Sequence, residues 1–223
     1  MIGVILAAGR SSRFKHVKSK LEYEFKGKPI VKHVFDSLNK SADEIIVVVG
    51  ENENNIKKIL GDNIKYIKQE QALGTGNAVL CCENFVKGRF IVCNGDKPLV
   101  TKESFDKFRK LKENIGVSTI ISDNPLRRGR IIRENNIFKE IKEFKDASDS
   151  EKEIKEVNAG IYLFDDKVFE YLKKVKNNNA SKEYYLTDVF SMYVKDKIKI
   201  GIVNVSEKEG FDVNTLEEVN MIS

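Results

Sequence analysis

The chain has 223 residues, of which 41% are hydrophobic and 33% charged, a composition typical of globular proteins. No apolar run reaches the length of a membrane span, and an apolar strand begins at residue 2, so we expect no membrane insertion and a cytoplasmic protein. The net charge of +5 is spread along the chain without a basic stripe, which argues against a nucleic-acid partner and fits a small anionic ligand.

The first half of the sequence alternates apolar runs, typical of buried strands, with segments of helical spacing. The predicted strands comprise residues 2–6, 44–49, 64–68 and 90–93, and the predicted helices comprise residues 29–38, 54–60, 76–85 and 102–111. This alternation predicts an α/β fold, with a Rossmann-like, mostly parallel, twisted sheet and helices on both of its faces.

The second half has a different pattern. Residues 115–122 and 157–164 are predicted strands, and short alternating segments within 130–144 predict a small antiparallel subregion. A helix at 183–194, a strand at 198–205 and a helix at 215–220 are predicted to follow. Because no Pro/Gly/Ser-rich linker divides the chain, we expect a single domain with a substrate-binding subregion added to its α/β core.

The end of the first strand has the character of a phosphate loop. Ala7, Ala8 and Gly9 leave backbone N–H groups accessible, and Arg13 and Lys20 add positive charge. Exposed backbone donors beside cations suit a polyphosphate; the alternative is a plain turn with solvated cations. The P-loop pattern Gly-x₄-Gly-Lys-Ser/Thr and the dinucleotide pattern Gly-x-Gly-x-x-Gly are both absent here.

Further polar and small residues flank later strands, where ligands of open α/β sheets bind. We therefore expect them to converge on one cleft. The amide of Gln69 can both donate and accept hydrogen bonds, as recognition of a nucleobase edge requires. The residues of this group are Gln69, Gly74, Thr75, Asn94, Gly95, Asp96 and Asn158. For Thr75 the alternative is a helix cap.

Two of the polar residues suit a magnesium site. Asp96 follows a strand, and Asn214 lies in a Gly-Phe-Asp-Val-Asn-Thr segment near the C-terminus. Mg²⁺ prefers oxygen ligands and takes few of them from protein. The alternatives are a turn aspartate and a helix N-cap. With two histidines and no Cys-x-x-Cys pair, the sequence argues against zinc.

Several segments together resemble the nucleotide-sugar pyrophosphorylases, in particular the uridylyltransferase domains of bacterial N-acetylglucosamine-1-phosphate uridylyltransferases. They cover nearly the whole chain, and the last is the most specific. The segments are LAAGRSSR at 6–13 with Lys20, LGTGNA at 73–78, GDKPL at 95–99, GRIIRE at 129–134, EFKDAS at 143–148, EVNAG at 156–160 and NNNASKEYYLTD at 177–188.

The resemblance implies Mg²⁺-dependent transfer of a nucleotidyl group from UTP to N-acetylglucosamine-1-phosphate, giving UDP-N-acetylglucosamine and pyrophosphate. It implies that Arg13 and Lys20 are catalytic and that Asp96 and Asn214 bind Mg²⁺. Implied nucleotide contacts are Leu6, Ala7, Ala8, Gly9, Gln69, Gly74, Thr75, Asn94 and Gly95. Implied sugar contacts are Gly129, Glu143, Asn158, Tyr185 and Thr187. One domain over residues 1–223 would then have a nucleotide-binding part at about 1–112 and a sugar-binding part at about 113–223.

Three residues depart from the pattern of these enzymes, and the resemblance covers only the uridylyltransferase half of proteins that are usually bifunctional. Ala72 replaces a glutamine common in the base loop, which leaves dTTP with glucose-1-phosphate, or CTP with an alditol phosphate, as alternative substrates. Lys97 replaces a small apolar residue beside Asp96, which supports a non-catalytic nucleotide-sugar sensor. Ser19 replaces a proline. Retention of Arg13, Lys20, Asp96 and Asn214 together favours an enzyme over a sensor.

Overall fold

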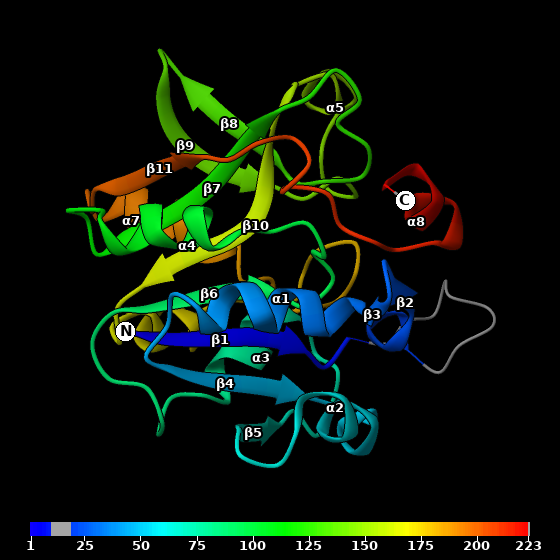
Figure 1. Cartoon of the computed structure of the whole chain (residues 1–223). Helices are drawn as coiled ribbons and strands as arrows, with labels where there is room; N and C mark the ends of the chain where they lie inside the picture. The colour runs from blue at the N-terminus through cyan, green and yellow to red at the C-terminus, as the bar shows by residue number, and fades with distance from the viewer. Residues whose placement is uncertain (10–18, 223) are drawn as a thin grey trace.

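The computed structural model describes residues 1–9 and 19–222, and within them a nine-stranded sheet forms the centre of the molecule. Its main path runs β11-β7-β10-β6-β1-β4-β5, and β8 and β9 branch from β10 (Figure 1). The strands are β1 (Ile2–Ala7), β4 (Glu44–Val49), β5 (Lys65–Lys68), β6 (Phe90–Asn94), β7 (Ile115–Ile121), β8 (Arg130–Glu134), β9 (Ile137–Lys142), β10 (Glu156–Phe164) and β11 (Ile200–Asn204).

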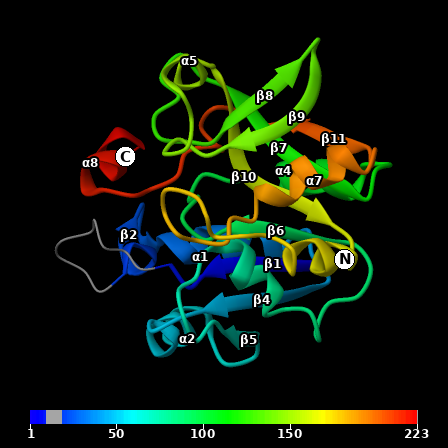
Figure 2. The same cartoon turned by 180° about the vertical axis from the view of Figure 1, so that it is seen from behind.

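Helices cover both faces of this sheet, as Figures 1 and 2 show from opposite sides. Buried side chains of α1 (Ile30–Asn39), α2 (Glu53–Leu60) and α4 (Lys102–Arg109) belong to one apolar cluster. Buried side chains of α3 (Thr75–Leu80), α6 (Val168–Leu172) and α7 (Asp188–Lys195) belong to a second. The predicted fold class, a mostly parallel sheet between two helical layers, is confirmed.

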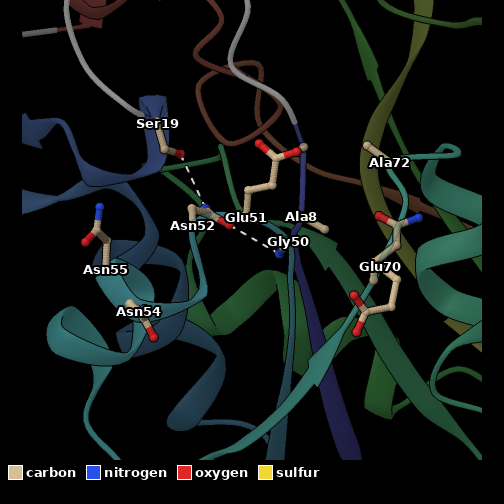
Figure 3. Close-up of a pocket in the computed structure, with 11 residues that line it drawn as sticks. Ala8, Ser19, Gly50, Glu51, Asn52, Asn54, Asn55, Glu70 and Ala72 are labelled. Atoms are coloured by element: carbon tan, nitrogen blue, oxygen red, sulfur yellow. Dashed lines mark hydrogen bonds between the residues drawn. The ribbon is translucent and has the colours of Figure 1, made fainter.

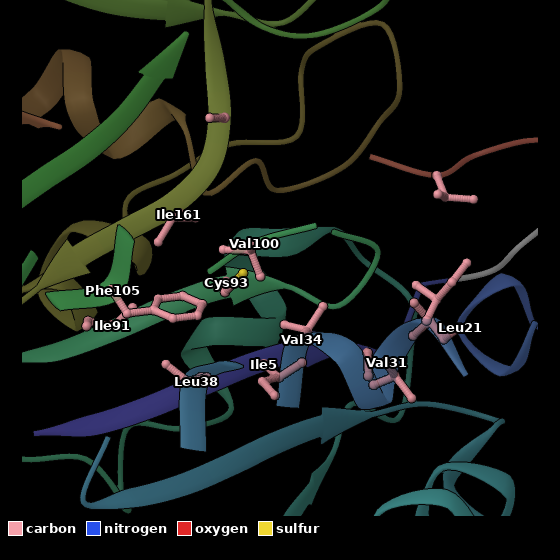
Figure 4. Packing of buried hydrophobic residues seen from close by; sticks show 14 of the residues in the cluster. Ile5, Leu21, Val31, Val34, Leu38, Ile91, Cys93, Val100, Phe105 and Ile161 are labelled. Atoms are coloured by element: carbon pink, nitrogen blue, oxygen red, sulfur yellow. The ribbon is translucent and has the colours of Figure 1, made fainter. Parts of the chain in front are cut away.

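The first cluster shows why the central strands read as unbroken apolar runs. Val34 and Leu38 of α1 and Phe105 of α4 pack over Ile5 of β1 and Ile91 of β6 (Figure 4). The alternate side chains of β1 and β6 enter the second cluster on the opposite face. A strand buried on both faces needs apolar residues at every position, so alternation is lost.

The registers bring several strand ends to one edge of the sheet. Leu6 pairs with both Val48 and Asn94, and Val49 pairs with Lys68. The carboxyl ends of β1, β4, β5 and β6 are therefore level. Strand β10 is antiparallel to β6 and β7, so its beginning, rather than its end, lies at the same edge. This orientation places the predicted residue Asn158 beside the ends of the parallel strands.

The antiparallel subregion is confirmed as the β8–β9 hairpin, whereas two predicted helices are wrong in extent. Helix α3 ends at Leu80 rather than at 85, and turns follow it. Helix α7 begins at Asp188 rather than at 183, because residues 184–186 form hydrogen bonds to the loop at 73–76. Short elements were not predicted: η1 (Lys20–Glu22), β2 (Glu24–Phe25), β3 (Lys28–Pro29), α5 (Asp149–Lys152) and α6.

Residues 206–214, here called the strap, lead from β11 towards the terminal helix α8 (Leu216–Ile222) (Figure 1). The N–H of Val213 donates to the carbonyl of Asp96 at 2.9 Å, which joins the strap to the end of β6. None of the helices in the described part of the chain combines the length and apolar character needed to cross a bilayer.

Glu209 fastens the strap to the start of α4. Its carboxylate accepts hydrogen bonds from the hydroxyls of Thr101, Ser104 and Ser206 at 2.5, 2.6 and 2.8 Å. Burial acts to raise the pKa of Glu209, but hydrogen bonds from these three residues outweigh it and hold the pKa below its ordinary value. The ionised form is thus the one that the fold stabilises.

We predict that Glu209→Gln lowers the free energy of unfolding by about 2–3 kcal/mol at pH 7, because hydrogen bonds to a charged group contribute about 1.5–3 kcal/mol. Since the folded-state pKa is depressed, the difference is fully present above about pH 4.3, the unfolded-state pKa, and disappears as the pH falls through the folded-state pKa. Urea unfolding at several pH values measures it. Glu207 on the same strap is exposed and accepts one side-chain hydrogen bond, from Ser122, so it is the control: Glu207→Gln should cost below about 1 kcal/mol, and equal costs would contradict the role of Glu209.

Candidate active site

Among the described residues, three adjoining pockets form one cleft along the carboxyl edge of the sheet. Their volumes are about 420, 430 and 310 Å³, and we call them the outer, middle and inner pockets. The outer and middle pockets share Ala8, Gly9, Gln69 and Ala72. The middle and inner pockets share Thr75, Asn94 and Glu183. A ligand longer than one pocket can therefore extend along the cleft.

Asn52 organises the outer pocket (Figure 3). Its side-chain oxygen accepts from the N–H of Gly50 at 3.2 Å, and its side-chain nitrogen donates to the carbonyl of Ala7 at 3.1 Å and to the hydroxyl of Ser19 at 3.5 Å. One amide thus ties together the ends of β1 and β4 and the residue before Lys20. Sequence reasoning missed Asn52; the available signal was a polar residue two positions after the strand-ending Gly50.

A charged cluster lies where the middle pocket meets the inner one. The ammonium nitrogen of Lys20 is 2.5 Å from Oδ2 of Asp96 and 2.8 Å from Oδ1 of Asn214. Both Lys20 and Asp96 are largely buried, with side chains 17% and 16% exposed. The structure therefore brings together one predicted catalytic residue and both predicted metal ligands.

The donor set at this point fits a divalent cation. An ammonium already lies between two side-chain oxygens, and the other carboxylate oxygen of Asp96, Oδ1, is buried without a hydrogen-bond partner in the described part of the chain. An orphaned buried carboxylate oxygen is costly unless a cation or donor satisfies it. Carboxylate and amide oxygens are hard ligands of the kind that Mg²⁺ accepts.

Gln69 lines the middle pocket. Its side-chain nitrogen donates to the carbonyl of Gly74 at 3.1 Å and to Oδ1 of Asn77 at 2.8 Å. Because a carbonyl can only accept, the nitrogen end of the amide must face Gly74. The amide oxygen is then the end left to accept from a ligand, so Gln69 offers an acceptor rather than both functions expected from the sequence.

The loop at residues 73–76 is fastened to residues 184–186 by three hydrogen bonds. The N–H of Tyr184 donates to the carbonyl of Leu73, and the N–H of Gly76 donates to the carbonyl of Tyr184, both at 2.8 Å. The N–H of Leu186 donates to the hydroxyl of Thr75 at 3.0 Å. The alternative of Thr75 as a helix cap is wrong, because Thr75 lies inside α3 and Gly74 precedes it. The two loops form a wall shared by the middle and inner pockets.

The inner pocket is lined by preorganised polar groups. Thr187 donates its hydroxyl hydrogen to Glu143 at 2.8 Å. Asn158 donates to the hydroxyl of Tyr162 at 2.7 Å and accepts from the N–H of Gly160 at 2.9 Å. Burial is the main cause of the raised pKa of Glu143, with nearby carboxylates adding to it. The pocket therefore presents both donors and acceptors to a polyhydroxylated ligand.

Three charged residues that line the inner pocket, Lys97, Arg128 and Asp212, were not among the predicted contacts. Asp212 accepts from Nε of Arg128 at 3.2 Å and lies 4.0 Å from the ammonium of Lys97. Burial acts to raise the pKa of Asp212, but Lys97, Arg128 and Lys20 outweigh it and hold the pKa below its ordinary value. The ammonium of Lys97 donates to the carbonyl of Gly210 at 3.1 Å and makes no ion pair with Asp96 among the described residues. Its proximity to Asp96 in sequence therefore does not place it on that carboxylate.

The structure gathers most of the residues predicted to bind ligands. Arg13 lies outside the described residues. Ala7 and Gly95 are not among the lining residues of these pockets. The carbonyl of Ala7 accepts a hydrogen bond from the side chain of Asn52, and the N–H of Gly95 donates to the carbonyl of Leu6. The predicted residues that line the middle pocket are Leu6, Ala8, Gly9, Lys20, Gln69, Gly74, Thr75, Asn94 and Asp96. Those that line the inner pocket are Gly129, Glu143, Asn158, Tyr185, Thr187 and Asn214, with Thr75 and Asn94 shared.

Comparison with known proteins assigns this arrangement to a family. Residues 3–157, more than half of the chain, match the model of the MobA-like NTP transferase domain. The chain belongs to this family of NTP transferases. The matched range contains β1, the 73–76 loop and the Asp96 loop, which are the segments that form the middle pocket. A nucleotidyltransferase is therefore the class of enzyme to which the cleft belongs.

Relatives named bifunctional protein GlmU confirm the resemblance drawn from the sequence. The protein from Fervidobacterium nodosum is 43% identical over 212 residues, covering 91% of this chain and 46% of its own length. The protein from Staphylococcus epidermidis is 38% identical over 203 residues, covering 86% of this chain and 45% of its own length. The chain thus spans about half the length of these curated relatives.

Solved structures share the fold at lower identity. A protein from Bacillus anthracis assigned as a glucose-1-phosphate thymidylyltransferase has a TM-score of 0.83 at 24% identity, covering 100% of this chain and 94% of its own. The inositol-1-phosphate CTP transferase from T. maritima has a TM-score of 0.78 at 16% identity, covering 97% of this chain and 90% of its own. At these identities the likeness establishes the fold.

We predict that Gly74→Ala destabilises the protein more than Gly61→Ala does. The two glycines have nearly the same backbone, with φ and ψ of 107° and 174° at Gly74 and 97° and 167° at Gly61, so each substitution introduces similar strain of about 1–3 kcal/mol. A Cβ at Gly74 would lie 2.7 Å from the carbonyl oxygen of Tyr184, whereas a Cβ at Gly61 meets nothing within 4 Å.

Urea unfolding should show an extra cost of about 1–3 kcal/mol for Gly74→Ala. Hydrogen exchange at the amide of Tyr184 should accelerate in Gly74→Ala and not in Gly61→Ala, because only the first displaces the bonded loops. Equal stabilities, or unchanged exchange at Tyr184, would show that the wall between these loops does not depend on Gly74.

Proposed function

We propose that this chain catalyses the Mg²⁺-dependent reaction of UTP with N-acetylglucosamine-1-phosphate to give UDP-N-acetylglucosamine and pyrophosphate. The observation that carries the proposal is the position of Lys20, between Asp96 and Asn214, at the junction of the middle and inner pockets. Two phosphates bound in adjoining pockets repel each other, and an ammonium between the pockets reduces that repulsion and helps to position them for reaction. The GlmU relatives support the choice of substrates.

In the proposed reaction an oxygen of the sugar phosphate attacks the α-phosphorus of UTP in line. The bond from this phosphorus to the β-phosphate bridging oxygen breaks, and pyrophosphate leaves with the electron pair. The nucleophile is already an anion, so no residue must remove a proton. A bound Mg²⁺ supplies positive charge to the phosphate oxygens. Lys20 contributes a second positive charge, and Asp96 with Asn214 would hold the metal.

Gln69 provides a physical basis for base selection. Its amide nitrogen is engaged by Gly74 and Asn77, which leaves the oxygen to accept from the N3–H of uracil. Cytosine carries an unprotonated N3 at that position and would present a lone pair to a lone pair. This argues against the CTP alternative. Thymine has the same N3–H, so discrimination against dTTP depends on the methyl group of thymine and on the ribose 2′-hydroxyl that dTTP lacks.

The inner pocket supports the amino-sugar assignment. Glu143 lines it from the segment after β9 and Asn158 lines it from β10, and Thr187 fixes the carboxyl group of Glu143. These groups can accept from sugar hydroxyls or from an amide N–H. We accordingly assign residues of about 1–112 to nucleotide binding and residues of about 113–223 to the sugar side, within one domain.

The position of Lys97 weakens the alternative of a non-catalytic sensor. That alternative depended on an ammonium displacing the metal at Asp96. The ammonium of Lys97 instead bonds to Gly210 and approaches Asp212. The position of Lys97 therefore gives no support to a sensor in which this ammonium replaces the metal.

Pyrophosphate release tests the proposal across UTP, dTTP and CTP, each paired with N-acetylglucosamine-1-phosphate or glucose-1-phosphate, in the presence of Mg²⁺. We expect UTP with N-acetylglucosamine-1-phosphate to have the highest kcat/KM. CTP should be at least about 100-fold poorer, because a buried acceptor is left facing an acceptor. A higher kcat/KM for another pair would refute the substrate assignment, and no release from any pair would favour the sensor.

The variant Asp96→Ala tests the metal assignment in the same assay. It should fold and lose about 10²–10³-fold in kcat, the effect expected when one electrostatic contact to the transition state is removed. Circular dichroism and thermal unfolding establish that the variant is folded. Activity near that of the unaltered protein would contradict the metal assignment while leaving the substrate assignment to the panel above.

A further inference from the structure

The carboxylate of Asp212 has a separate partner for each of its oxygens. Oδ1 accepts from Arg128 at 3.2 Å and faces the ammonium of Lys97 at 4.0 Å. Oδ2 accepts from the side-chain nitrogen of Asn214. Two cations therefore hold Oδ1 of this carboxylate, and Oδ2 is available to accept a hydrogen bond from Asn214, which lines the inner pocket.

The orientation of the Asn214 amide decides what it offers to the middle pocket. An asparagine amide has an oxygen end and a nitrogen end of nearly the same shape, and a rotation of 180° exchanges them. Asp212 can only accept, so the nitrogen end must face it. The oxygen end then faces Lys20 at 2.8 Å, where a cation is required to lie if Asp96 and Asn214 bind one.

Lys97 contacts Asp212 and Gly210, and its ammonium does not lie between Asp96 and Asn214. Its side chain is 3% exposed, and Gly160, with φ of +72°, lies against it: a Cβ there would be 2.3 Å from Cε of Lys97. A buried ammonium needs a carboxylate or several carbonyls, and Asp212 with Gly210 provides both kinds of partner. Lys97, the residue that follows Asp96, thus has Asp212 as its counter-charge, and Asp212 precedes Asn214 by two residues.

We propose that Asp212 is a positioning residue that turns the oxygen of the Asn214 amide towards the cation position, and that Lys97 and Arg128 hold Asp212 in place for this purpose. The proposal rests on the proposed function, because it takes Asn214 to be a metal ligand. In this proposal Lys97 and Asp212 do not contact the metal. They raise its affinity by holding the Asn214 side chain in the orientation that binds it.

Titration of the full chain with Mn²⁺, followed by electron paramagnetic resonance, tests the proposal without turnover. Asp212→Asn removes the acceptor-only partner, since an asparagine at 212 can present either end. We expect the Mn²⁺ dissociation constant to rise about 10-fold or more, as for loss of other groups that orient metal ligands. Glu207→Gln removes an exposed carboxylate from the same strap and should leave the constant within about twofold.

A second substitution separates orientation from charge. In the variant Asp212→Asn/Asn214→Asp the side chain at 214 carries an oxygen at both ends and needs no orienting partner, and the net charge equals that of the unaltered protein. We expect this variant to recover Mn²⁺ affinity to within about threefold. Because a carboxylate at 214 also raises Mn²⁺ affinity by its own charge, Asn214→Asp alone is the reference. If Asp212 orients the amide, Asp212→Asn should weaken Mn²⁺ binding less than about threefold in the Asn214→Asp background; an equal loss in both backgrounds would contradict the orienting role.

Thermal unfolding accompanies each titration, because Asp212→Asn leaves Lys97 and Arg128 beside a neutral amide. If that variant does not fold, Lys97→Met/Asp212→Asn removes one uncompensated charge and takes its place in the same titration. Unchanged Mn²⁺ affinity in the folded variant, failure of the exchanged pair to recover it, or no Mn²⁺ binding by the unaltered protein would overturn the proposal. The expected pattern in a protein that forms no UDP-N-acetylglucosamine would support it and contradict the proposed function alone.

Discussion

The cleft depends on one charged contact that joins three distant parts of the chain. Lys20 follows the first strand, Asp96 follows β6, and Asn214 lies at the end of the strap. Their side chains meet within 2.5–2.8 Å, which fixes where the middle and inner pockets join. The proposed function rests on this contact, because the proposal places the reaction of two phosphates beside the ammonium of Lys20 and the oxygens that would hold a metal.

The sheet topology makes that meeting possible. Level carboxyl ends of β1, β4, β5 and β6 form one side of the edge. The reversed strand β10 adds its beginning, so Asn158 and Gly160 stand beside the end of β6. A parallel β10 would have placed these residues at the opposite edge. One antiparallel strand therefore brings residues of the inner pocket beside the middle pocket.

Sequence patterns predicted the core strands and the convergence of the polar loops for a simple reason. Strands β1, β4 and β6 are buried on both faces, and this leaves unbroken apolar runs whose ends mark the edge of the sheet. The error at residues 183–187 has an equally physical cause. The segment was predicted as part of the helix that follows it, but Tyr184 and Leu186 form hydrogen bonds with the 73–76 loop, a tertiary contact that local spacing does not encode.

The group of charged residues that lines the inner pocket could not be predicted from local patterns either. Asp212 follows Lys97 and Arg128 by more than eighty residues in the sequence, and its partners are apparent only in the fold. Lys97 was interpreted from its neighbour Asp96, yet its side chain turns to the strap. Asn52 was missed similarly, because its role is to tie Gly50 to Ala7 and Ser19 across three segments.

A crystal structure with UDP-N-acetylglucosamine and Mg²⁺ tests the central claim, that the two pockets hold the two halves of one reaction. The account predicts the uracil beside Gln69, the diphosphate at Lys20 and Asp96, and the sugar between Glu143 and Asn158. A sugar bound outside the inner pocket, or a nucleotide bound in the reverse direction with its base at Glu143, would contradict it.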